Sequence, residues 1–432
     1  MPRNVPLGGR RRGSRSAIAV DTSVPALMMR IGTYPLHHGS VGAVRSLGRL
    51  GIPVFAVTED RFTPTAQSRY LRRAIVWRTT GAEDPQELVS RLLEIGAEIG
   101  ARPVLVATDD EAALLIAEHA PALSELFRLP RVAADLPRRL ASKQGLATLC
   151  RELDVAAPAS GAPRSMDELF EEAHRIGFPL IVKNDEAWLR LTNPAVPSST
   201  LVHDLAGLEA LAAGWPSLPS VLLQEHIPPD GAQDWIVHAY FGEDPETVVA
   251  FTGIKLRSWP PKAGVTALAY STPNPDLLQL AVGFGRRAGF RGIADMDWRL
   301  DARDGRYKLL DFNPRMGAQF RMFDTVDGVD VVRALHLDLT GRPVPRGHQI
   351  DGRRYVVGHL SGPSALASLR DGRAATQPWS RAGAGAERAW FAIDDPVPAA
   401  IAAARLAAGA PRTLAALLSQ LCLLYTSDAA DE

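Results

Sequence analysis

The sequence predicts an α/β region followed by an α+β region, and three observations point to this combination. The first 130 residues alternate short apolar runs with amphipathic helical patterns, as in a parallel, doubly wound sheet. After Pro137, short strands are separated by Gly, Pro and Asp, which is typical of antiparallel pairing. At 432 residues the chain is also too long for one ordinary core, so two or three domains are expected.

The composition excludes several classes of partner. Lys plus Arg equals Asp plus Glu at 48 each, so no broad basic surface for nucleic acid is expected. No apolar run approaches the length of a membrane span, and no membrane partner is predicted. The two cysteines, Cys150 and Cys422, cannot form a disulfide framework, which favours a reducing cytoplasm.

The N-terminal elements follow in order. Residues 1–26 are basic and rich in Gly and Pro, and we expect a disordered leader. Helices are predicted over 39–50 and from Asp84-Pro85 onward, where an N-cap precedes a proline at the first helical position. Buried strands are predicted at residues 27–34, 52–57, 72–78 and 103–108. The sequence thus predicts a domain over 27–135.

The second half is expected to be α+β. Helices are predicted over 142–153, 167–176 and 275–289. The predicted strands are 178–184, 220–227, 234–241 and 247–259. Residues 341–420 form a C-terminal extension that we expect to cap the core or to mediate association, for example as a homodimer. Residues 421–432 do not continue the preceding Ala-rich pattern, and we interpret them as a non-native tail.

The most informative stretch is "ADMDWRLDARDGRYKLLDFNPR", residues 294–315. Two alternating runs flank a turn at Arg303-Asp304-Gly305, where the glycine can adopt the left-handed conformation. Pairing outward from this turn places Asp297 opposite Asp311, and Asp295 opposite Asn313. The other face is predicted to join the core through Met296, Trp298, Leu300, Leu310 and Phe312.

Facing carboxylates require a cation. Like charges directly opposite each other destabilise a sheet, so removal of the Asp311 carboxylate is expected to hold or raise the stability of the free protein. Carboxylates with an amide oxygen suit Mg²⁺ or Mn²⁺, which predicts a ligand set of Asp297, Asp311 and Asn313, with Arg315 holding an anion beside it. The alternative is a solvated hairpin face of mixed charge.

At "LLDFNPR" the chain resembles the ATP-grasp superfamily, whose closing motif has the form acid-x-Asn-Pro-Arg, and Asp297-Trp298 is similar to the preceding metal-binding strand. The resemblance covers roughly residues 28–335 and points to the carboxylate–amine ligases. It implies a Rossmann-like pre-domain and an ATP-grasp region over 136–340, with a small lid at about 155–228 and an antiparallel, metal-binding core at about 229–340.

The resemblance also implies roles for individual side chains. Lys143 and Lys183 would be the two nucleotide-binding lysines; otherwise they are solvated surface lysines. Backbone at Gln224, His226 and Ile227 would pair with adenine as an exposed strand edge, Glu225 would face the purine amino group, and Asp234 would contact ribose or order the phosphates. The catalytic residues would be Arg315, Lys255 and Arg257, the last two on one strand face beside the transferred phosphate. His238 is interpreted as a core histidine.

One feature departs from the superfamily. No glycine lies between Lys183 and Val202, where a Gly-rich loop usually covers the phosphates, although Ser198, Ser199 and Thr200 offer hydroxyl groups. In the N-terminal region, the loop at His38 to Ser40 and the segment "TDDEAA" at 108–113 are expected to touch the acceptor substrate. The same segment has an alternative role as a helix cap.

We therefore expect an ATP-dependent carboxylate–amine ligase that uses ATP with Mg²⁺ or Mn²⁺ and small carboxylate and amine substrates. The reaction would pass through an acyl phosphate and release ADP and phosphate. A catalytically weak or inactive ATP/Mg-binding module is the alternative, favoured by the missing glycines. A nicotinamide oxidoreductase is a third reading, but the N-terminal glycines lack the G-x-G-x-x-G spacing.

Overall fold

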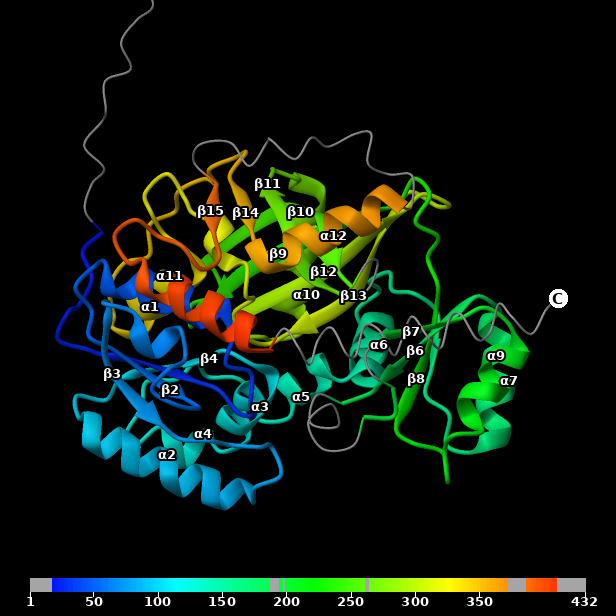
Figure 1. Ribbon diagram of the computed structural model, residues 1–432, viewed down its shortest axis with the longest axis horizontal. Coiled ribbons are helices and arrows are strands. Elements are labelled where there is room, and N and C mark those ends of the chain that lie inside the picture. Colours follow the sequence, from blue (N-terminus) through cyan, green and yellow to red (C-terminus); the bar gives the residue numbers. More distant parts are fainter. Residues whose placement is uncertain (1–17, 187–193, 197–198, 261–263, 371–385, 410–432) are drawn as a thin grey trace, which may run out of the picture.

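The computed structural model describes residues 18–186, 194–196, 199–260, 264–370 and 386–409. Three β-sheets with flanking helices make up this part of the chain (Figure 1). The predicted leader, apart from residues 18–26, and the predicted tail lie outside the described residues. Ala26 already belongs to the first strand, one residue before the predicted boundary.

The N-terminal sheet is parallel, as predicted. Its strand order is β3-β2-β1-β4, and each neighbouring pair is parallel. The strands are β1 (Ala26–Met29), β2 (Val54–Thr58), β3 (Leu71–Val76) and β4 (Val104–Ala107). Because β1 is central and β4 lies on its other side, the loops after β1 and β4 meet at the point where the strand order reverses, the usual place for a ligand in such sheets.

The helices of this region begin where the sequence provides caps. The Asp84 side chain accepts from the Gln86 backbone N at the start of α2 (Pro85–Ile99), which confirms the predicted cap and first-position proline. Asp109 caps α3 (Asp110–Glu118). The predicted helix over 39–50 is α1 (His38–Gly48), and the short α4 (Ala120–Leu123) follows α3.

A second, antiparallel sheet of four strands has the order β5-β8-β6-β7. Its strands are β5 (Ser160–Gly161), β6 (Leu180–Asn184), β7 (Ser199–Val202) and β8 (Val221–Glu225). Helices α7 (Met166–Ile176) and α9 (Leu205–Ala212) cover its outer side (Figure 1). Helices α5 (Leu136–Ala141) and α6 (Lys143–Glu152) connect it to the N-terminal region.

The third sheet has seven strands in the order β13-β12-β9-β10-β11-β14-β15. The strands predicted from the sequence are β9 (Gln233–Phe241), β10 (Val248–Trp259), β12 (Gly292–Asp301) and β13 (Arg306–Asn313). Strand β11 (Val265–Ser271) was not predicted. All pairs from β13 to β14 are antiparallel, so the predicted change from α/β to α+β is confirmed.

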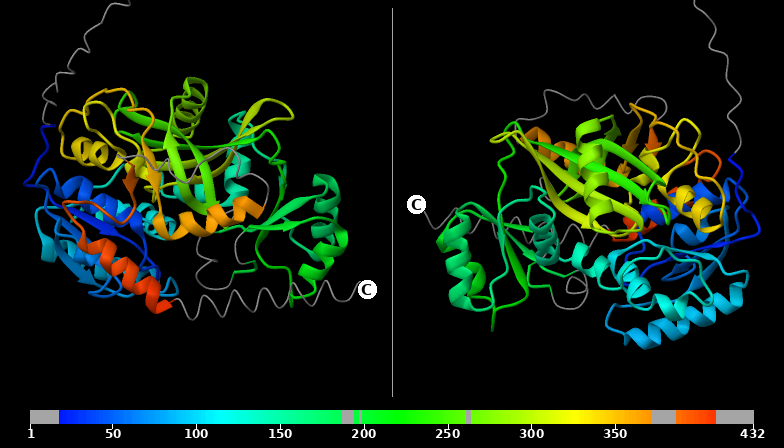
Figure 2. Two further views of the ribbon diagram at one scale, coloured as in Figure 1. Left: turned by 45° about the horizontal axis from the view of Figure 1, so that its top comes forward. Right: turned by 180° about the vertical axis from the view of Figure 1, so that it is seen from behind.

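Each face of this large sheet has its own core. One face packs against α10 (Pro275–Arg287) and the α5–α6 pair, around Trp298, Phe284 and Phe312. The opposite face packs against α1, α11 (Val331–Leu339) and the 3-10 turn η2 (Phe320–Met322). Figure 2 shows α10 on one side of the sheet and the N-terminal region with α12 (Gly358–Arg370) on the other.

The hairpin of β12 and β13 has the predicted facing pairs but a different turn. Asp297 pairs with Asp311 and Asp295 with Asn313, as predicted. The turn, however, has four residues between Asp301 and Arg306, with Gly305 at φ 69° in the left-handed region. A β-bulge between Asp297 and Trp298 restores the register.

The bulge corrects one core assignment. Leu309, which pairs with Trp298, is 1% exposed and belongs to the core. The predicted core residue Leu310 is only partly buried, because it is the extra residue of the bulge.

The C-terminal segment is part of the fold. Strand β14 (Arg354–Val356) pairs with β11, and β15 (Glu387–Arg388) pairs with β14. A helix from residue 397 to at least 409 follows. The described part of this segment therefore extends the core sheet, and a role in association stays a prediction.

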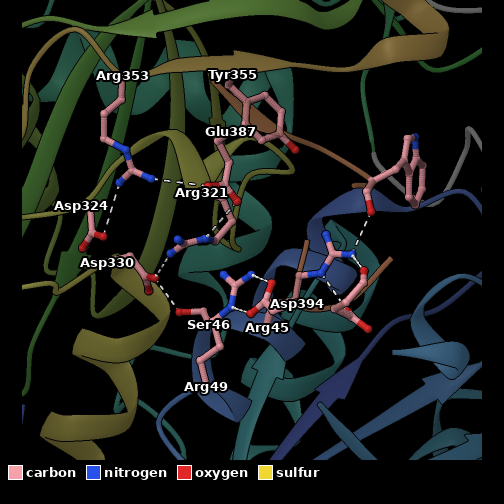
Figure 3. A network of polar contacts seen from close by, with 12 residues as sticks. Arg45, Ser46, Arg49, Arg321, Asp324, Asp330, Arg353, Tyr355, Glu387 and Asp394 are labelled. Carbon is pink, nitrogen blue, oxygen red and sulfur yellow. Dashed lines mark hydrogen bonds and ion pairs between the residues drawn. The ribbon is translucent and has the colours of Figure 1, made fainter. Parts of the chain in front are cut away.

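A polar network anchors this segment to α1 (Figure 3). Arg45, 2% exposed, donates through Nε to Asp395 at 2.9 Å and through Nη2 to the Trp390 carbonyl at 2.8 Å. Arg49 forms a two-bond ion pair with Asp394 at 2.8 and 2.9 Å. The N-terminal region and the C-terminal segment are thus joined by buried charge.

Within the described residues, no helix has the length and apolar character needed to cross a membrane.

Candidate functional site

The predicted carboxylates lie on one face of the seven-stranded sheet, near its edge. Asp297 of β12 and Asp311 of the edge strand β13 are direct cross-strand partners, and each side chain is 27% exposed. Met296, Trp298 and Phe312 fill the core on the opposite face. Strand alternation therefore aims both carboxylates at the same open region.

Lysine side chains compensate both carboxylates. Lys143 Nζ lies 2.5 Å from Asp311 Oδ1, and Lys183 Nζ lies 3.9 Å from the same atom. Lys255 Nζ donates to Asp297 Oδ1 at 2.8 Å. Three lysines named from the sequence are thus brought to the predicted acidic pair, from α6, β6 and β10.

The charges shift one another's pKa values. Burial acts to raise the pKa of Asp311, but Lys143 and Lys183 outweigh it and lower that pKa to about 2. Burial acts to lower the pKa of Lys143, but Asp311 outweighs it and raises that pKa. Burial lowers the pKa of Lys183, and Asp311 offsets only part of this effect. The site is therefore a compact cluster of acidic and basic side chains that shift one another's pKa values.

The surroundings of Asp297 shift its pKa in opposite directions. Burial raises its pKa, and the charges of Asp295 and Asp311 add to this, against the attraction of Lys255. The contact between Lys255 and Asp297 raises the pKa of Lys255, although burial acts to lower it. A carboxylate under this repulsion favours a further cation.

Lys143 is positioned by local hydrogen bonds at the start of α6. The Ser142 side chain caps this helix by accepting from the Gly145 backbone N at 3.1 Å, as predicted. The Lys143 backbone N donates to the Asp185 carbonyl at 3.1 Å, and Asp185 Oδ1 accepts from the Gln144 backbone N at 2.8 Å. Asp185, just after β6, therefore fixes the start of α6 at Lys143 relative to Lys183 of β6.

Asp295 forms a second centre that the sequence reading left out of the site. Its Oδ2 accepts from Arg315 Nη1 at 2.7 Å, and its Oδ1 lies 3.0 Å from His238 Nε2. Burial acts to raise the pKa of Asp295, but His238 and Arg315 outweigh it and hold that pKa well below the usual value. His238 is fully buried, in agreement with its interpretation as a core histidine. The signal for Asp295 was its place two residues before Asp297, on the same strand face.

Asn313 and Arg315 follow on the same hairpin. Asn313 Nδ2 donates to the Asp295 carbonyl at 3.1 Å, which leaves the amide oxygen as the acceptor. Arg315 Nε lies 3.1 Å from Asp110 Oδ1 at the start of α3. In the "TDDEAA" segment, Asp109 caps the helix, as one alternative predicted. Asp110 contacts Arg315, and contact of the segment with an acceptor substrate stays a prediction.

The donor set fits a hard cation that has further ligands from a bound molecule. Among the described residues, no group of three or more His, Cys, Asp or Glu side chains is arranged to hold a metal ion. Asp297, Asp311 and Asn313 offer two carboxylates and one amide oxygen, which are oxygen ligands of the kind that Mg²⁺ prefers. Mg²⁺ bound in this way commonly completes its octahedron with water and phosphate oxygens.

The segment predicted to pair with adenine is only partly available. Strand β8 lies between β5 and β6, and Gln224 is paired on both sides. The Glu225 backbone N donates to the Ala159 carbonyl at 2.8 Å. The premise of an exposed strand edge is therefore wrong at Gln224 and Glu225, because the two-residue strand β5 occupies that edge. Only His226 and Ile227 lie beyond the strand.

Two further predicted residues have charged partners. Arg303 Nη2 donates to Glu225 Oε1 at 2.6 Å. Asp234 forms a two-bond ion pair with Arg299 at 2.6 and 3.1 Å, and Arg299 also donates to the Ile227 carbonyl at 3.1 Å. Arg299 was expected only as part of a mixed-charge face, but it ties Asp234 to the end of β8.

Lys255 and Arg257 have different partners. A register shift in the β10–β11 pairing lies between them, and Arg257 Nη2 donates to Ser361 Oγ of α12 at 3.2 Å. Burial lowers the pKa of Arg257. Lys255 alone of the two contacts the hairpin carboxylates. Ser198 lies outside the described residues.

The N-terminal loop approaches the site from the other side. A Cβ atom at Gly39 would lie 2.9 Å from Ala318 Cα and 3.2 Å from Met316 Cε, so this glycine permits close packing beside Arg315. The side chain of His37 caps α1 by accepting from the Ser40 backbone N at 3.2 Å. The predicted residues His38 to Ser40 form the first turn of α1, and their contact with an acceptor substrate stays a prediction.

Comparison with known proteins yields one curated relative and many similar structures. No protein-family model matches the chain. It is 25% identical over 296 residues to a D-aspartate ligase of Enterococcus faecium (strain Aus0004), a match that covers 64% of this chain and 68% of that protein. The length of this match is similar to that of the segment, roughly residues 28–335, over which the resemblance was predicted.

Solved structures give the fold. The N5-carboxyaminoimidazole synthetase of Staphylococcus aureus, complexed with ADP, matches with a TM-score of 0.57 and 12% identity over 77% of this chain and 81% of that chain. The L-amino acid ligase of Bacillus licheniformis matches with a TM-score of 0.56 and 15% identity over 76% and 78%. The chain has the ATP-grasp fold. Its predicted resemblance to the carboxylate–amine ligases of this superfamily is confirmed.

One expected part of an ATP-grasp protein differs here. The segment after Lys183 contains no glycine before Val202, and residues 187–193 of it lie outside the described part. Asn184 fixes the position of residues 194–196, because its side chain accepts from the Ala195 and Val196 backbone N atoms at 2.8 and 3.2 Å. Ser199 and Thr200 begin β7, where Ser199 pairs with Lys183. Ser199 is thus the cross-strand partner of Lys183, and the donation of these hydroxyl groups to phosphates stays a prediction.

Proposed function

We propose that the chain is an ATP-dependent carboxylate–amine ligase that forms an amide or peptide bond. The observation that carries this proposal is the facing pair Asp297 and Asp311, each compensated by a lysine, in an ATP-grasp fold. Three lysines already held at one acidic pair form a site whose cations can move to phosphate oxygens when a nucleotide binds. The ADP in the synthetase structure supports a nucleotide as the ligand.

The regions take the roles of the superfamily in this proposal. Residues 27–135 are the Rossmann-like pre-domain, and the four-stranded sheet at about 155–228 is the lid. The core at about 229–340 carries the metal site. Lys143 and Lys183 hold the phosphates, the backbone at His226 and Ile227 is the available part of the adenine contact, and Asp234 contacts ribose or orders the phosphates through Arg299.

The reaction has two steps. An oxygen of the substrate carboxylate attacks the γ-phosphorus, the bond to the β-phosphate oxygen breaks, and ADP leaves. The nitrogen of an amine then attacks the acyl carbon, inorganic phosphate leaves, and the nitrogen loses its extra proton. Phosphorylation is required because a free carboxylate has no good leaving group.

The chain's own residues position these groups. Lys255 and Arg315 flank the hairpin carboxylates and would stabilise the negative charge that develops during transfer. Arg257 extends this positive side along β10 toward α12. A divalent cation held by Asp297, Asp311 and Asn313 would screen the repulsion between the nucleotide and the attacking carboxylate.

A screen of ADP release tests the proposal. Purified protein is given ATP, Mg²⁺ and pairs of amino acids or small carboxylates, with D-aspartate included because of the curated relative. A productive pair should release ADP only when both members are present, and the Lys183→Met variant should abolish the signal.

ATP use fits a cytoplasmic enzyme, and a homodimer remains a prediction.

A non-catalytic ATP/Mg-binding module is the second candidate, favoured by the absence of glycine between Lys183 and Val202. Tight nucleotide binding without ADP release for any pair would favour the module. Release that depends on both substrates would favour the ligase.

A further inference from the structure

Asp110 is a carboxylate at the site that the proposed chemistry has not yet used. It is the first residue of α3, in the N-terminal region, and only 6% exposed. Its Oδ1 lies 3.1 Å from Nε of Arg315, the last residue of the hairpin motif. Its charge also contributes to the raised pKa of Lys143, after the larger effects of burial and Asp311. Asp110 therefore reaches the same charged centre from a different sheet.

The fold does not require this carboxylate for the start of the helix. Asp109 is the N-cap of α3, with Oδ1 accepting from the Ala112 backbone N at 3.0 Å. Asp109 Oδ2 also accepts from the Ile31 backbone N at 2.8 Å, which ties the loops after β4 and β1 together. Arg315 has its own anchor in Asp295 at 2.7 Å. Asp110 is thus not the N-cap of α3, and Arg315 has an ion pair besides the one with Asp110.

Substrate binding would change the charge balance around Asp110. A triphosphate and a substrate carboxylate add negative charge and attract Lys143 and Arg315, the cations that now lie near Asp110. A buried carboxylate that loses its cation is strongly disfavoured. The proposed reaction supplies a replacement, because its second substrate is an amine that carries a positive charge in neutral water.

We propose that Asp110 binds the ammonium group of the acceptor amine and holds its nitrogen beside the activated carboxylate. This inference rests on the proposed ligase function. The predicted acceptor class is a primary amine that is protonated at neutral pH, such as an amino acid or a lysine-like side chain. The position of Asp110 at the reversal point of the parallel sheet is a usual place for a small ligand.

The test separates the two half-reactions. With ATP and the carboxylate alone, hydroxylamine traps the acyl phosphate as a hydroxamate, and hydroxylamine is uncharged at pH 7.5. With the amine acceptor, ligation is followed through the product. In the Asp110→Asn variant, hydroxamate formation should stay within about twofold of the wild type, while the KM for the amine should rise roughly 10- to 100-fold, as expected for loss of a charge-assisted hydrogen bond.

Two further variants serve as controls. Glu118→Gln removes a carboxylate from the other end of the same helix, where Glu118 pairs with Arg138 at 2.7 Å, and should change neither half-reaction. Asp110→Glu keeps the negative charge and should recover part of the amine affinity. Retained hydroxamate formation also shows that the Asn variant is folded.

Several outcomes would overturn the inference. If Asp110→Asn lowers hydroxamate formation and ligation equally, Asp110 acts through the position of Arg315 and does not bind the amine. An unchanged KM for the amine excludes the contact altogether. If the wild-type protein forms neither hydroxamate nor amide with any pair, the proposed function itself fails, and the inference fails with it.

Discussion

At the scale of single residues, the carboxylates of the hairpin are paired with lysines before any ligand arrives. The sequence named both the facing acids and the three lysines, but not their pairing with one another, since the lysines come from α6, β6 and β10. The sequence led us to expect that loss of the Asp311 carboxylate would hold or raise the stability of the free protein. The ion pairs with lysine reverse this expectation. Removal of the carboxylate would leave Lys143 and Lys183 partly buried without their anion.

The Asp311→Asn variant should lose ADP release and should also be less stable than the wild type without ligand, by about 1–3 kcal/mol. The physical reason is the loss of the anion that Lys143 contacts at 2.5 Å. Urea denaturation of the free protein measures this difference. Equal or greater stability of the variant would show that cross-strand repulsion dominates after all.

Asp109 predicts a pH dependence. Burial, together with the nearby charge of Glu111, raises the pKa of Asp109 from 3.8 to about 7. Between about pH 4 and 7 the folded state therefore keeps a proton that the unfolded state has lost, so this residue's contribution to stability falls as the pH rises, by at most about 1.4 kcal/mol per unit.

Denaturation of the wild type and the Asp109→Asn variant at pH 5 and pH 7.5 measures this effect. The stability advantage of the wild type over the variant should shrink at the higher pH. A difference that is the same at both pH values would contradict the raised pKa.

At the scale of elements, the β12–β13 hairpin shows what alternation can and cannot predict. Pairing outward from the turn gave both facing pairs near the far end, because a four-residue turn and a bulge together shift the register by the amount that a three-residue turn would. Alternation alone could not place the bulge, so Leu310 was assigned to the core in place of Leu309.

Alanine substitutions at these two adjacent positions test the register. Leu309→Ala should cost about 2–4 kcal/mol because Leu309 is 1% exposed and packs in the core. Leu310→Ala should cost less than about 1 kcal/mol, since this side chain is only partly buried. The reverse order in thermal or urea denaturation would place the bulge elsewhere.

Three of the strands that the sequence did not predict have a common cause. Strands β5, β14 and β15 have two or three residues each, too few for a periodic pattern, and they form because longer strands offer an edge. The presence of β5 also explains why the strand edge at Gln224, which was predicted to pair with adenine, is already paired. In contrast, Lys143, Lys183, Lys255 and Arg315 were named through the resemblance to the ATP-grasp superfamily, which does not depend on such short strands.

At the scale of the whole molecule, charged side chains join α1 to the C-terminal segment (Figure 3). Asp395 is 1% exposed and accepts from Arg45, from Ser68 Oγ at 2.7 Å and from the Arg69 backbone N at 3.0 Å. The C-terminal segment therefore stabilises the same N-terminal region whose loops approach Arg315. A sequence reading could not find this contact, because its partners are about 350 residues apart.

Asp395→Ala should destabilise the protein by about 3–5 kcal/mol, because it leaves Arg45 buried without an anion. The neighbouring Asp394→Ala should cost about 1 kcal/mol or less, since Asp394 and its partner Arg49 are 38% and 27% exposed. Guanidinium denaturation of both variants checks the pair. Similar small losses in both would mean that the C-terminal segment is not anchored as described.

The most direct test of the central claim is the Mg²⁺ dependence of nucleotide binding, measured by titration calorimetry with a non-hydrolysable ATP analogue. The wild type should bind the analogue on the order of tenfold more tightly with Mg²⁺ than with a chelator. The Asp297→Asn/Asp311→Asn double variant should show no such gain from Mg²⁺. An undiminished Mg²⁺ effect in the double variant would contradict the assignment of the facing carboxylates as the metal site.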